Sequence, residues 1–357
     1  MSHHVGDYLV PMGTTDEQAM IADVIASLND SFPLGDTTDP RGVWDQLVEL
    51  GAHAAILGAD DDSLSLDDLI VIAERLGAGL NAETFLWGGV VVPSLLRSLG
   101  DSDAPSDLVA RLEEGALATI ALHHGTGDLA SAGDALILDG SSVSGRADAV
   151  PYRASADVLL AVARSGHSRV LVEVIDPARV AWIDREPFDL RTPLAEARFD
   201  AVPVRILGDL PDDLRAVLST ALLLQGAAVV GSAQQALADA VGYSRVREQF
   251  GVPISHFQAV RHRLAESLVE LELMRATLRR AARSDDDTAF LLASYHCLTA
   301  APTIARANIQ VHGGIGYTWE HTAHRHYRYP FAARQAICSL EGLERHLMDA
   351  VIGGGAR

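Results

Sequence analysis

The chain has 357 residues and a formal net charge of -20, and all 28 of its basic residues are arginine, because the sequence contains no lysine. The absence of lysine excludes a Schiff-base enzyme, a pyridoxal-phosphate anchor and a phosphate-binding loop lysine. A hydrophobic content of 48% predicts a packed globular protein, and the acidity argues against nucleic acid as the main partner.

The charge is distributed unevenly along the chain. Residues 1–200 carry 12 arginines and 33 acidic residues, whereas residues 201–357 carry 16 arginines and 15 acidic residues. The acidic first part is typical of a solvated surface. The nearly neutral second part is the better place for a site that binds an anion, and arginine or backbone N–H groups must provide that site.

Cysteine usage and the N-terminal residues bear on the compartment. Cys297 and Cys338 fit no metal-binding or redox spacing, which predicts two reduced thiols. Residues 1–11 have no basic segment followed by an apolar one, so we expect no signal peptide. No apolar run approaches the roughly 18–20 residues of a membrane helix. We therefore expect a cytoplasmic protein with no membrane span.

Helical periodicity dominates the first third of the chain. Apolar residues recur at helical spacing in residues 42–51 and 67–76, and Pro93 begins a shorter helix that Gly100 ends. These patterns predict an N-terminal helical domain over residues 1–115.

The period changes over residues 116–207. Short apolar or alternating runs, divided by turn signals such as Asp139-Gly140 and Ser165-Gly166, predict strands. The runs are residues 116–122, 135–138, 158–163 and 169–175. We expect a small, mostly antiparallel β domain here.

The pattern is helical again over residues 208–357. The predicted long helices are residues 214–243, 257–284 and 288–312. Gly313-Gly314 ends the third helix, and Gly226 and Gly231 are spaced for close contact between helices. Such helices must bury broad apolar faces, which predicts a helical bundle that also forms oligomers. The whole chain thus predicts an α+β fold with a β domain between two helical domains.

Two segments of the third region stand out. Residues 247–254 read Arg-Glu-Gln-Phe-Gly-Val-Pro-Ile and are followed by Phe257-Gln258. Residues 310–320 read Gln-Val-His-Gly-Gly-Ile-Gly-Tyr-Thr-Trp-Glu. Within the first segment, Phe250 offers an apolar face.

The side chains of these segments suit a nucleotide. The planar Arg247 guanidinium presents N–H donors in a fixed geometry that fits a pyrophosphate. Gly313 and Gly314 have no side chains, so their backbone N–H groups can approach an anion. Gln258 and Gln310 donate and accept, which suits ribose, adenine or a flavin edge. Taken singly, Arg247 also fits an exposed helix end, and the two glycines fit a simple helix stop. Their occurrence together favours a ligand site.

In order and spacing, the two segments resemble the C-terminal signatures of the acyl-CoA dehydrogenase family. Residues 43–51 and 73–77 are similar to its N-terminal helices. The resemblance implies an N-terminal helical domain, a middle β domain and a C-terminal four-helix bundle. It also implies an FAD enzyme in which a carboxylate removes the α proton of an acyl-CoA thioester and the β hydride passes to the flavin, with electron-transfer flavoprotein as the acceptor.

The resemblance also assigns roles to residues. In family homotetramers, the elements that match the two segments reach the FAD held mainly by a neighbouring subunit. The implied cofactor-binding residues are Arg247, Phe250, Gln258, Gln310, Gly313 and Gly314.

The β region departs from the family pattern. Family members carry a tryptophan and a threonine that touch the flavin ring, in a segment that matches residues 145–157. Here Ala149 and Pro151 stand at those positions. Proline has neither a hydroxyl nor a backbone N–H, so Pro151 cannot donate to a flavin. The chain keeps the half of the flavin site that a subunit gives to its neighbour and lacks the half that it would use itself.

The catalytic base of the family occurs at one of two places. One lies in the first C-terminal helix, where this chain has Ala221-Leu222 and no carboxylate. The other is a Tyr-Glu-Gly-Thr near the end, where residues 340–343 read Leu-Glu-Gly-Leu. Glu341 is therefore either the base or a surface glutamate near Glu344 and Arg345.

Three hypotheses follow. Some bacterial members, including ones that degrade steroid side chains, assemble from two different homologous subunits with one flavin per pair. This chain resembles the subunit that lends FAD contacts while its partner carries the base, which is our main hypothesis. The alternatives are a self-sufficient homo-oligomeric acyl-CoA dehydrogenase that uses Glu341, and a flavin-free structural or regulatory subunit. The sequence does not specify a fatty, branched or steroid acyl group.

A histidine-rich stretch follows the second segment. His321, His324 and His326 have no accompanying set of cysteine or carboxylate ligands, so we expect no metal here and predict a surface or subunit-interface role.

Overall fold

The computed structural model describes residues 15–34, 39–51, 53, 64–99, 106–122, 127–186, 188–189, 191–284 and 286–353. The chain divides into two compact units. The bundle unit comprises Met1–Leu34, Leu66–Ala82 and Leu223–Ala333, and the barrel unit comprises Gly35–Ser65, Glu83–Leu222 and Arg334–Arg357.

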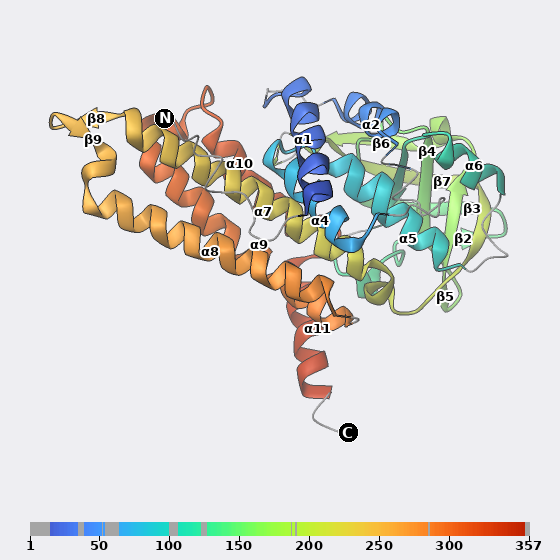
Figure 1. The fold of residues 1–357 in the computed structure, drawn as a ribbon. Helices are drawn as coiled ribbons and strands as arrows, with labels where there is room; N and C mark the ends of the chain where they lie inside the picture. The colour runs from blue at the N-terminus through green and yellow to red at the C-terminus, as the bar shows by residue number, and fades with distance from the viewer. Residues whose placement is uncertain are drawn as a thin grey trace. The chain divides into compact units, whose positions relative to one another are not determined.

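The bundle unit is built from helices, of which α7, α8 and α9 are the longest (Figure 1). Its helices are α1 (Asp16–Ser31), α4 (Leu66–Ala78), most of α7 (Leu214–Val246), α8 (Gln258–Ala282), α9 (Asp287–His312) and α10 (Ala323–Ala333). A short hairpin, β8 (Glu248–Gln249) with β9 (Val252–Pro253), joins α7 to α8. The predicted long helices are thus confirmed to within a few residues.

Glycines let α4 and α7 cross closely. A Cβ built on Gly231 would lie 1.7 Å from the backbone oxygen of Glu74, and one on Gly77 would lie 1.9 Å from that of Ala228. Neither position has room for a side chain, so the two backbones are in direct contact. The close approach predicted for Gly231 is therefore confirmed.

A buried ion pair lies beside this crossing. The Arg275 guanidinium on α8 is almost fully buried and donates to the Glu74 carboxylate on α4, with Nε 2.9 Å from Oε1. It also donates to Glu272 at 2.9 Å and to the Gln234 side-chain oxygen on α7. Three helices are thereby tied together by one side chain.

The barrel unit carries the strands and several shorter helices. The helices are α2 (Pro40–Glu49), the π-helical segment η2 (Phe85–Val91), α5 (Val92–Arg97), α6 (Ser106–Glu113) and α11 (Leu340–Gly353). The strands are β1 (Ala118–Ala121), β2 (Leu136–Asp139), β3 (Ser142–Pro151), β4 (Val158–Ser165), β5 (Ser168–Val174), β6 (Ala181–Arg185) and β7 (Leu194–Leu210).

Five of the strands pair in a closed ring. The order is β4, β2, β3, β7 and β5, and β5 pairs again with β4. All of these pairings are antiparallel except the single β2–β4 contact, while β1 adds to β4 in parallel and β6 adds to β7. The mostly antiparallel β region between two helical regions confirms the predicted fold class. The predicted domain boundaries remain predictions.

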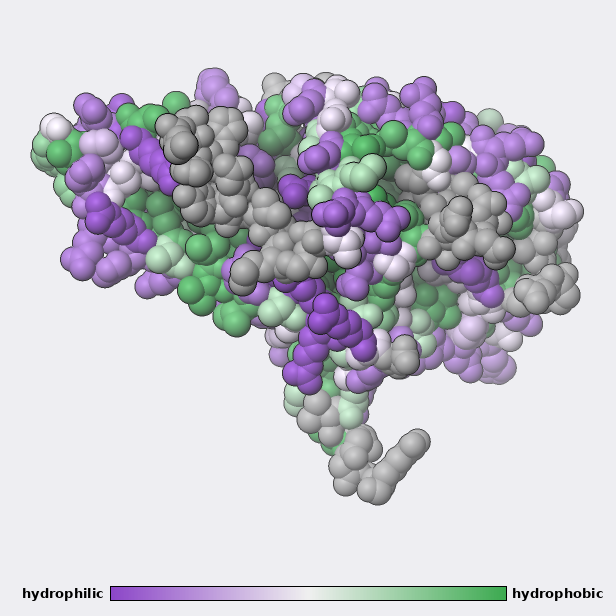
Figure 2. Space-filling view, in the orientation of Figure 1, coloured by the Kyte–Doolittle hydropathy of each residue, from purple (hydrophilic) through white to green (hydrophobic). Residues whose placement is uncertain are grey.

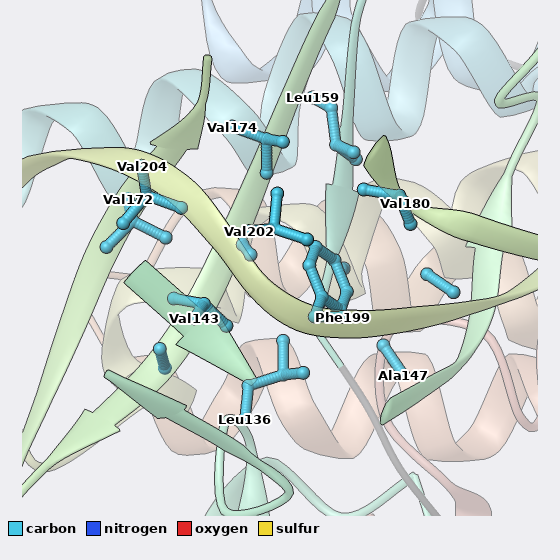
Figure 3. Packing of buried hydrophobic residues seen from close by; sticks show 14 of the residues in the cluster. Leu136, Val143, Ala147, Leu159, Val172, Val174, Val180, Phe199, Val202 and Val204 are labelled. Carbon is cyan, nitrogen blue, oxygen red and sulfur yellow. The ribbon is translucent and has the colours of Figure 1, made fainter. Parts of the chain in front are cut away.

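The ring encloses a small apolar core. Buried side chains from the strands converge in its interior (Figure 3), among them Leu136, Val143, Val172, Phe199 and Val202. Most of the core residues are alanine or valine, which fits the narrow interior of a few-stranded barrel. The outward positions of β3 and β7 are polar, as the alternation along a strand requires.

One expectation about membranes needs correction. Helix α7 is long and apolar enough, by length and composition, to cross a membrane. However, 83% of its apolar window is buried inside the structure, which is the behaviour of a central helix in a packed core. The apolar stretch was missed in the sequence because uncharged polar residues, among them Ser219, Thr220, Gln225 and Ser232, interrupt it.

Candidate functional site

The first segment forms a hairpin at the end of the bundle unit (Figure 1). Helix α7 ends at Val246, the Arg247 N–H donates to the Tyr243 carbonyl at 2.9 Å, and the Ile254 N–H donates to the Arg247 carbonyl at 2.8 Å. Phe250 and Gly251 form the turn, both with positive φ, 55° and 80°. Two such residues in a row are typical of the tight turn that matches the twist of a hairpin.

The turn holds an aromatic side chain out of the fold. Phe250 is 93% exposed and meets only the ring of Phe257 edge-on, at a centroid distance of 6.0 Å. The surface view shows hydrophobic residues among hydrophilic ones at this tip (Figure 2). A phenylalanine at positive φ carries a backbone cost of roughly 1 kcal/mol or more, so this exposed placement is not one that stability favours.

Arg247 and Gln258 stand at the two ends of the hairpin. Both side chains are exposed, and neither forms a hydrogen bond or an ion pair with any residue in the described part of the chain. By contrast, the nearby Arg261 is anchored, since its Nε donates to the Ser255 carbonyl at 2.6 Å. Arg247 and Gln258 are thus available to a ligand or to another chain.

The second segment lies where α9 ends. Gly313 terminates the helix with φ 66° and ψ −139°, a conformation that favours glycine, and its N–H donates to the Ile309 carbonyl. A Cβ built on Gly313 or Gly314 would meet nothing within 4 Å, so both backbones face open space. Gln310, one turn earlier, is exposed and has no side-chain hydrogen bond among the residues that the structure covers.

An aromatic contact brings the two segments together. Tyr243 lies on α7, one turn before Arg247. Its ring contacts the ring of His312 at the end of α9, with the centroids 4.4 Å apart. The end of α7 and the end of α9 are therefore neighbours. Arg247 and Gly313 therefore lie at the same end of the bundle unit.

The chemistry of this end fits an adenine nucleotide with a pyrophosphate. It offers one guanidinium fork, two glycine backbones without side chains, two primary amides and an apolar ring. Guanidinium and backbone donors bind phosphate oxygens, and amides pair with ribose and ring edges. Glu248 is the only acidic residue within the hairpin. The predicted FAD contacts from Arg247, Phe250, Gln258, Gln310, Gly313 and Gly314 remain predictions that this donor set supports.

The candidate base lies in the barrel unit. Glu341 is an exposed residue in the first turn of α11, which Ser339 caps by accepting the Gly342 N–H at 3.1 Å. No described residue pairs with its carboxylate. A carboxylate in the first turn of a helix is stabilised by the helix dipole, which is a sufficient structural reason for a glutamate here. Its catalytic role stays a prediction.

The end of β3 is packed by the chain itself. The Thr119 hydroxyl donates to the Pro151 carbonyl at 2.7 Å, and the next residue, Tyr152, is buried with φ 34°. The Tyr152 hydroxyl donates to the Ala118 carbonyl at 3.1 Å. The polar atoms at this strand end are therefore used inside the fold, and Ala149 and Pro151 offer no side-chain donor.

The histidines that follow the second segment have separate environments. His321 stacks on His312 at 4.2 Å, His324 meets Trp319 edge-on, and His326 is buried against the Ser232 hydroxyl at 3.1 Å. No group of three or more histidine, cysteine or carboxylate ligands that could hold a metal occurs within the described ranges.

Two clusters escaped the sequence-based reasoning. One is the Tyr243–His312–His321 stack. The other is buried Asp128, which pairs with Arg345 and lies 3.3 Å from His346 in the barrel unit. A signal for the first existed, because Tyr243 lies one helical turn before Arg247 and His312 lies inside the second segment. The second joins residues far apart in the chain and has no local pattern.

Comparisons with known proteins fit this geometry. Residues 216–333 match the family described as "Acyl-CoA dehydrogenase, C-terminal domain". The chain is a homologue of the acyl-CoA dehydrogenases. The match contains both segments of the candidate site, so the resemblance to this family is confirmed.

Individual relatives agree with this result. The acyl-CoA dehydrogenase IpdE2 of Mycolicibacterium smegmatis is 34% identical over 125 residues, which is 35% of this chain and 40% of that protein. The chain thus spans about two fifths of the length of this curated relative. Among solved structures, the "Tcur3481-Tcur3483 steroid ACAD" variant is 25% identical with a TM-score of 0.82, covering 96% of this chain and 99% of that one. The ChsE4-ChsE5 complex of Mycobacterium tuberculosis, at 22% identity and a TM-score of 0.79 over 96% and 99% of the two chains, shares the fold.

Proposed function

We propose that this acyl-CoA dehydrogenase homologue is the subunit of a hetero-oligomer that lends FAD contacts to a homologous partner, while the partner carries the base for α,β-dehydrogenation of an acyl-CoA. Two similar solved structures bear names that join two proteins, Tcur3481-Tcur3483 and ChsE4-ChsE5, and one of them is called a steroid ACAD. They support a two-subunit assembly and make a steroid-derived or other lipid acyl group a reasonable substrate class.

One observation carries the proposal. Arg247, Gln258 and Gln310 are exposed at one end of the bundle unit without a partner among the described residues, beside two glycine backbones that face open space. At the positions where a subunit would hold its own flavin, Ala149 and Pro151 provide no donor. The chain therefore has donors for a cofactor held elsewhere and lacks them for one of its own.

Each residue has a distinct task in this proposal. Arg247 neutralises and orients the pyrophosphate, and the Gly313 and Gly314 backbones allow close approach of the same anion. Gln258 and Gln310 fix the ribose and ring edges, and Phe250 packs against the apolar part of the cofactor or its surroundings. FAD, when bound, supplies the hydride acceptor. Electron-transfer flavoprotein would then take the electrons, and the cytoplasm is the proposed compartment.

Two alternatives make different predictions. A self-sufficient enzyme that uses Glu341 requires the lone chain to bind FAD and to lose turnover when Glu341 is changed to Gln. A flavin-free structural or regulatory subunit requires that the FAD content of the complex be insensitive to Arg247. The exposed and unpartnered Arg247 favours the lending subunit over the second alternative.

The test uses the full chain, alone and co-expressed with a homologous subunit encoded nearby. We expect flavin absorbance and acyl-CoA turnover only in the complex. Arg247→Ala is expected to weaken FAD binding by the complex about tenfold to a hundredfold, since a hydrogen bond to a charged group contributes about 1.5–3 kcal/mol. Arg245→Ala, which removes an equally exposed arginine two residues earlier, is the matched control and should have little effect.

The outcomes separate the hypotheses. Full FAD occupancy and turnover by the lone chain would overturn the lending role. A complex in which Arg247→Ala and Arg245→Ala behave alike would favour the flavin-free subunit.

A further inference from the structure

The loop that follows Gly313 is closed at its base by two imidazoles in contact, with their ring planes inclined by 52°. His312 precedes the loop and His321 follows it, and their ring centroids lie 4.2 Å apart. The ring of Tyr243 on α7 also contacts His312, with the two ring centroids 4.4 Å apart. The three rings, here called the clasp, connect His312, the residue before Gly313, to the end of α7.

The hydrogen bonds of the clasp fix the protonation of each ring. The His312 Nδ1 lies 3.0 Å from the Asn308 carbonyl, which only accepts, so Nδ1 carries the proton. The His321 Nδ1 accepts the Ala323 N–H at 3.1 Å, so this nitrogen must keep its lone pair. A proton added to His321 at Nδ1 removes that bond, and a proton added to His312 places a charge against its neighbour.

The groups that face the clasp reinforce the neutral state. Burial lowers the pKa of His312, which the bond to Asn308 offsets in part. Burial and the neighbouring His312 lower the pKa of His321, against a smaller opposing effect of Asp239 on α7. Gln235 occupies one oxygen of Asp239, donating at 2.8 Å. These contacts thus favour the neutral form of both imidazoles in the closed loop.

We propose that the clasp is a positioning device for the anion-binding backbone of Gly313 and Gly314, and that protonation of His312 and His321 opens it and releases the cofactor; this proposal rests on the FAD-lending function above. A charged clasp contains two like charges in contact and has lost the Ala323 bond. The loop then no longer holds its glycines beside Arg247. Since the closed form has the lower pKa, acid favours the open form, and the effect grows as the pH falls below the ordinary histidine value of about 6.5.

The other charged groups near the site would leave cofactor affinity unchanged in acid or would raise it. Arg247 and a pyrophosphate diester keep their charges throughout this range. His256 and His262 are both exposed near the hairpin, where any positive charge favours an anion. Weaker cofactor binding in acid is therefore a specific expectation of the clasp.

The first test measures FAD affinity of the complex. Between about pH 7.5 and about pH 5.5 we expect the wild-type affinity to fall by up to about tenfold for each of the two histidines, because pH 5.5 lies about one unit below the ordinary histidine pKa. His321→Phe keeps a ring at this position and removes one of the two imidazoles, so the acid decrease in affinity should be clearly smaller than in wild type, with only the His312 part remaining. His321→Ala should bind weakly at both pH values. His256→Asn, the control, should retain the wild-type decrease.

The second test needs no cofactor. Trp319 lies in the loop and is 57% exposed, whereas Trp44 and Trp87 are buried. The full chain alone is used with His324→Gln, which removes the imidazole that lies against Trp319. In this background the emission of Trp319, obtained by subtracting the Trp319→Phe variant, should change with acid, and it should change less when His321 is also replaced by Phe. FAD absent from the wild-type complex at every pH would count against the lending function. FAD that is bound at neutral pH, with the same acid decrease in His321→Phe as in wild type, would overturn the clasp.

Discussion

The buried Arg275–Glu74 pair gives a prediction whose size follows from its geometry. Arg275 is 2% exposed and Glu74 is 7% exposed, and Nε lies 2.9 Å from Oε1. The perturbation is Arg275→Met, which removes the guanidinium and keeps most of the side-chain volume. It leaves the Glu74 carboxylate buried, without a cation, beside the Gln234 side-chain oxygen that the arginine had also satisfied.

The expected cost distinguishes three variants. An unpaired buried charge costs about 3–5 kcal/mol, so Arg275→Met should lower the free energy of unfolding by that amount. Glu74→Gln should cost less, about 1–3 kcal/mol, because Arg275 keeps its contact with Glu272. Glu272→Gln is the control, since its side chain is 46% exposed and such pairs contribute about 0–1 kcal/mol.

The assay is chemical denaturation of the single variants and of the double variant Glu74→Gln with Arg275→Met. The double variant no longer buries an unpaired charge, so its cost should be smaller than the sum of the single costs by about 1–3 kcal/mol. The denaturant slope should stay constant, which would assign the change in midpoint to stability. Additive costs, or an Arg275→Met variant as stable as Glu272→Gln, would refute the reasoning.

Two further predictions concern the bundle unit. Gly231→Ala should destabilise the bundle unit by about 1–3 kcal/mol, because the new Cβ would lie 1.7 Å from the backbone oxygen of Glu74. Gly242→Ala on the same helix meets nothing within 4 Å and should stabilise the unit by about 0.5–1 kcal/mol. Thermal denaturation compares the two variants directly, and equal shifts in midpoint would contradict the close crossing of α4 and α7. Burial lowers the pKa of His326 to about 4. Its folded pKa lies below the unfolded value of about 6.5, so stability is present above that value and is lost as the pH falls towards 4, by about 2 kcal/mol between pH 7 and pH 5. His326→Gln should show a correspondingly flatter dependence in denaturation curves, and an unchanged dependence would exclude His326 as its source.

How much of the fold could be predicted depends on how local its causes are. Helices α8 and α9 were predicted to within a few residues because their apolar stripes are long and a glycine follows α9. Strand β7 was not predicted over any of its 17 residues; its pairing with β3 shifts register and Ala201 adopts a positive φ within it. The π-helical turns of η2 depend on tertiary contact, because Gly88 packs against Leu117 and Ala118.

The candidate site was likewise predicted only in its local parts. Arg247, Gln258 and the Gly313-Gly314 pair lie in two short segments whose order alone indicated a nucleotide, and folding adds their shared location. Tyr243 and His312 lie in or beside the two segments, but the contacts of the clasp were not predicted because its rings come from α7, from the end of α9 and from the far side of the loop. A motif states which donors are present, whereas the packing of residues that donate nothing to the ligand decides whether those donors are held in place. If the clasp sets FAD affinity, the acid sensitivity of this subunit resides in His312 and His321, and changing Arg247 should lower affinity equally at every pH while changing His321 should alter its pH dependence.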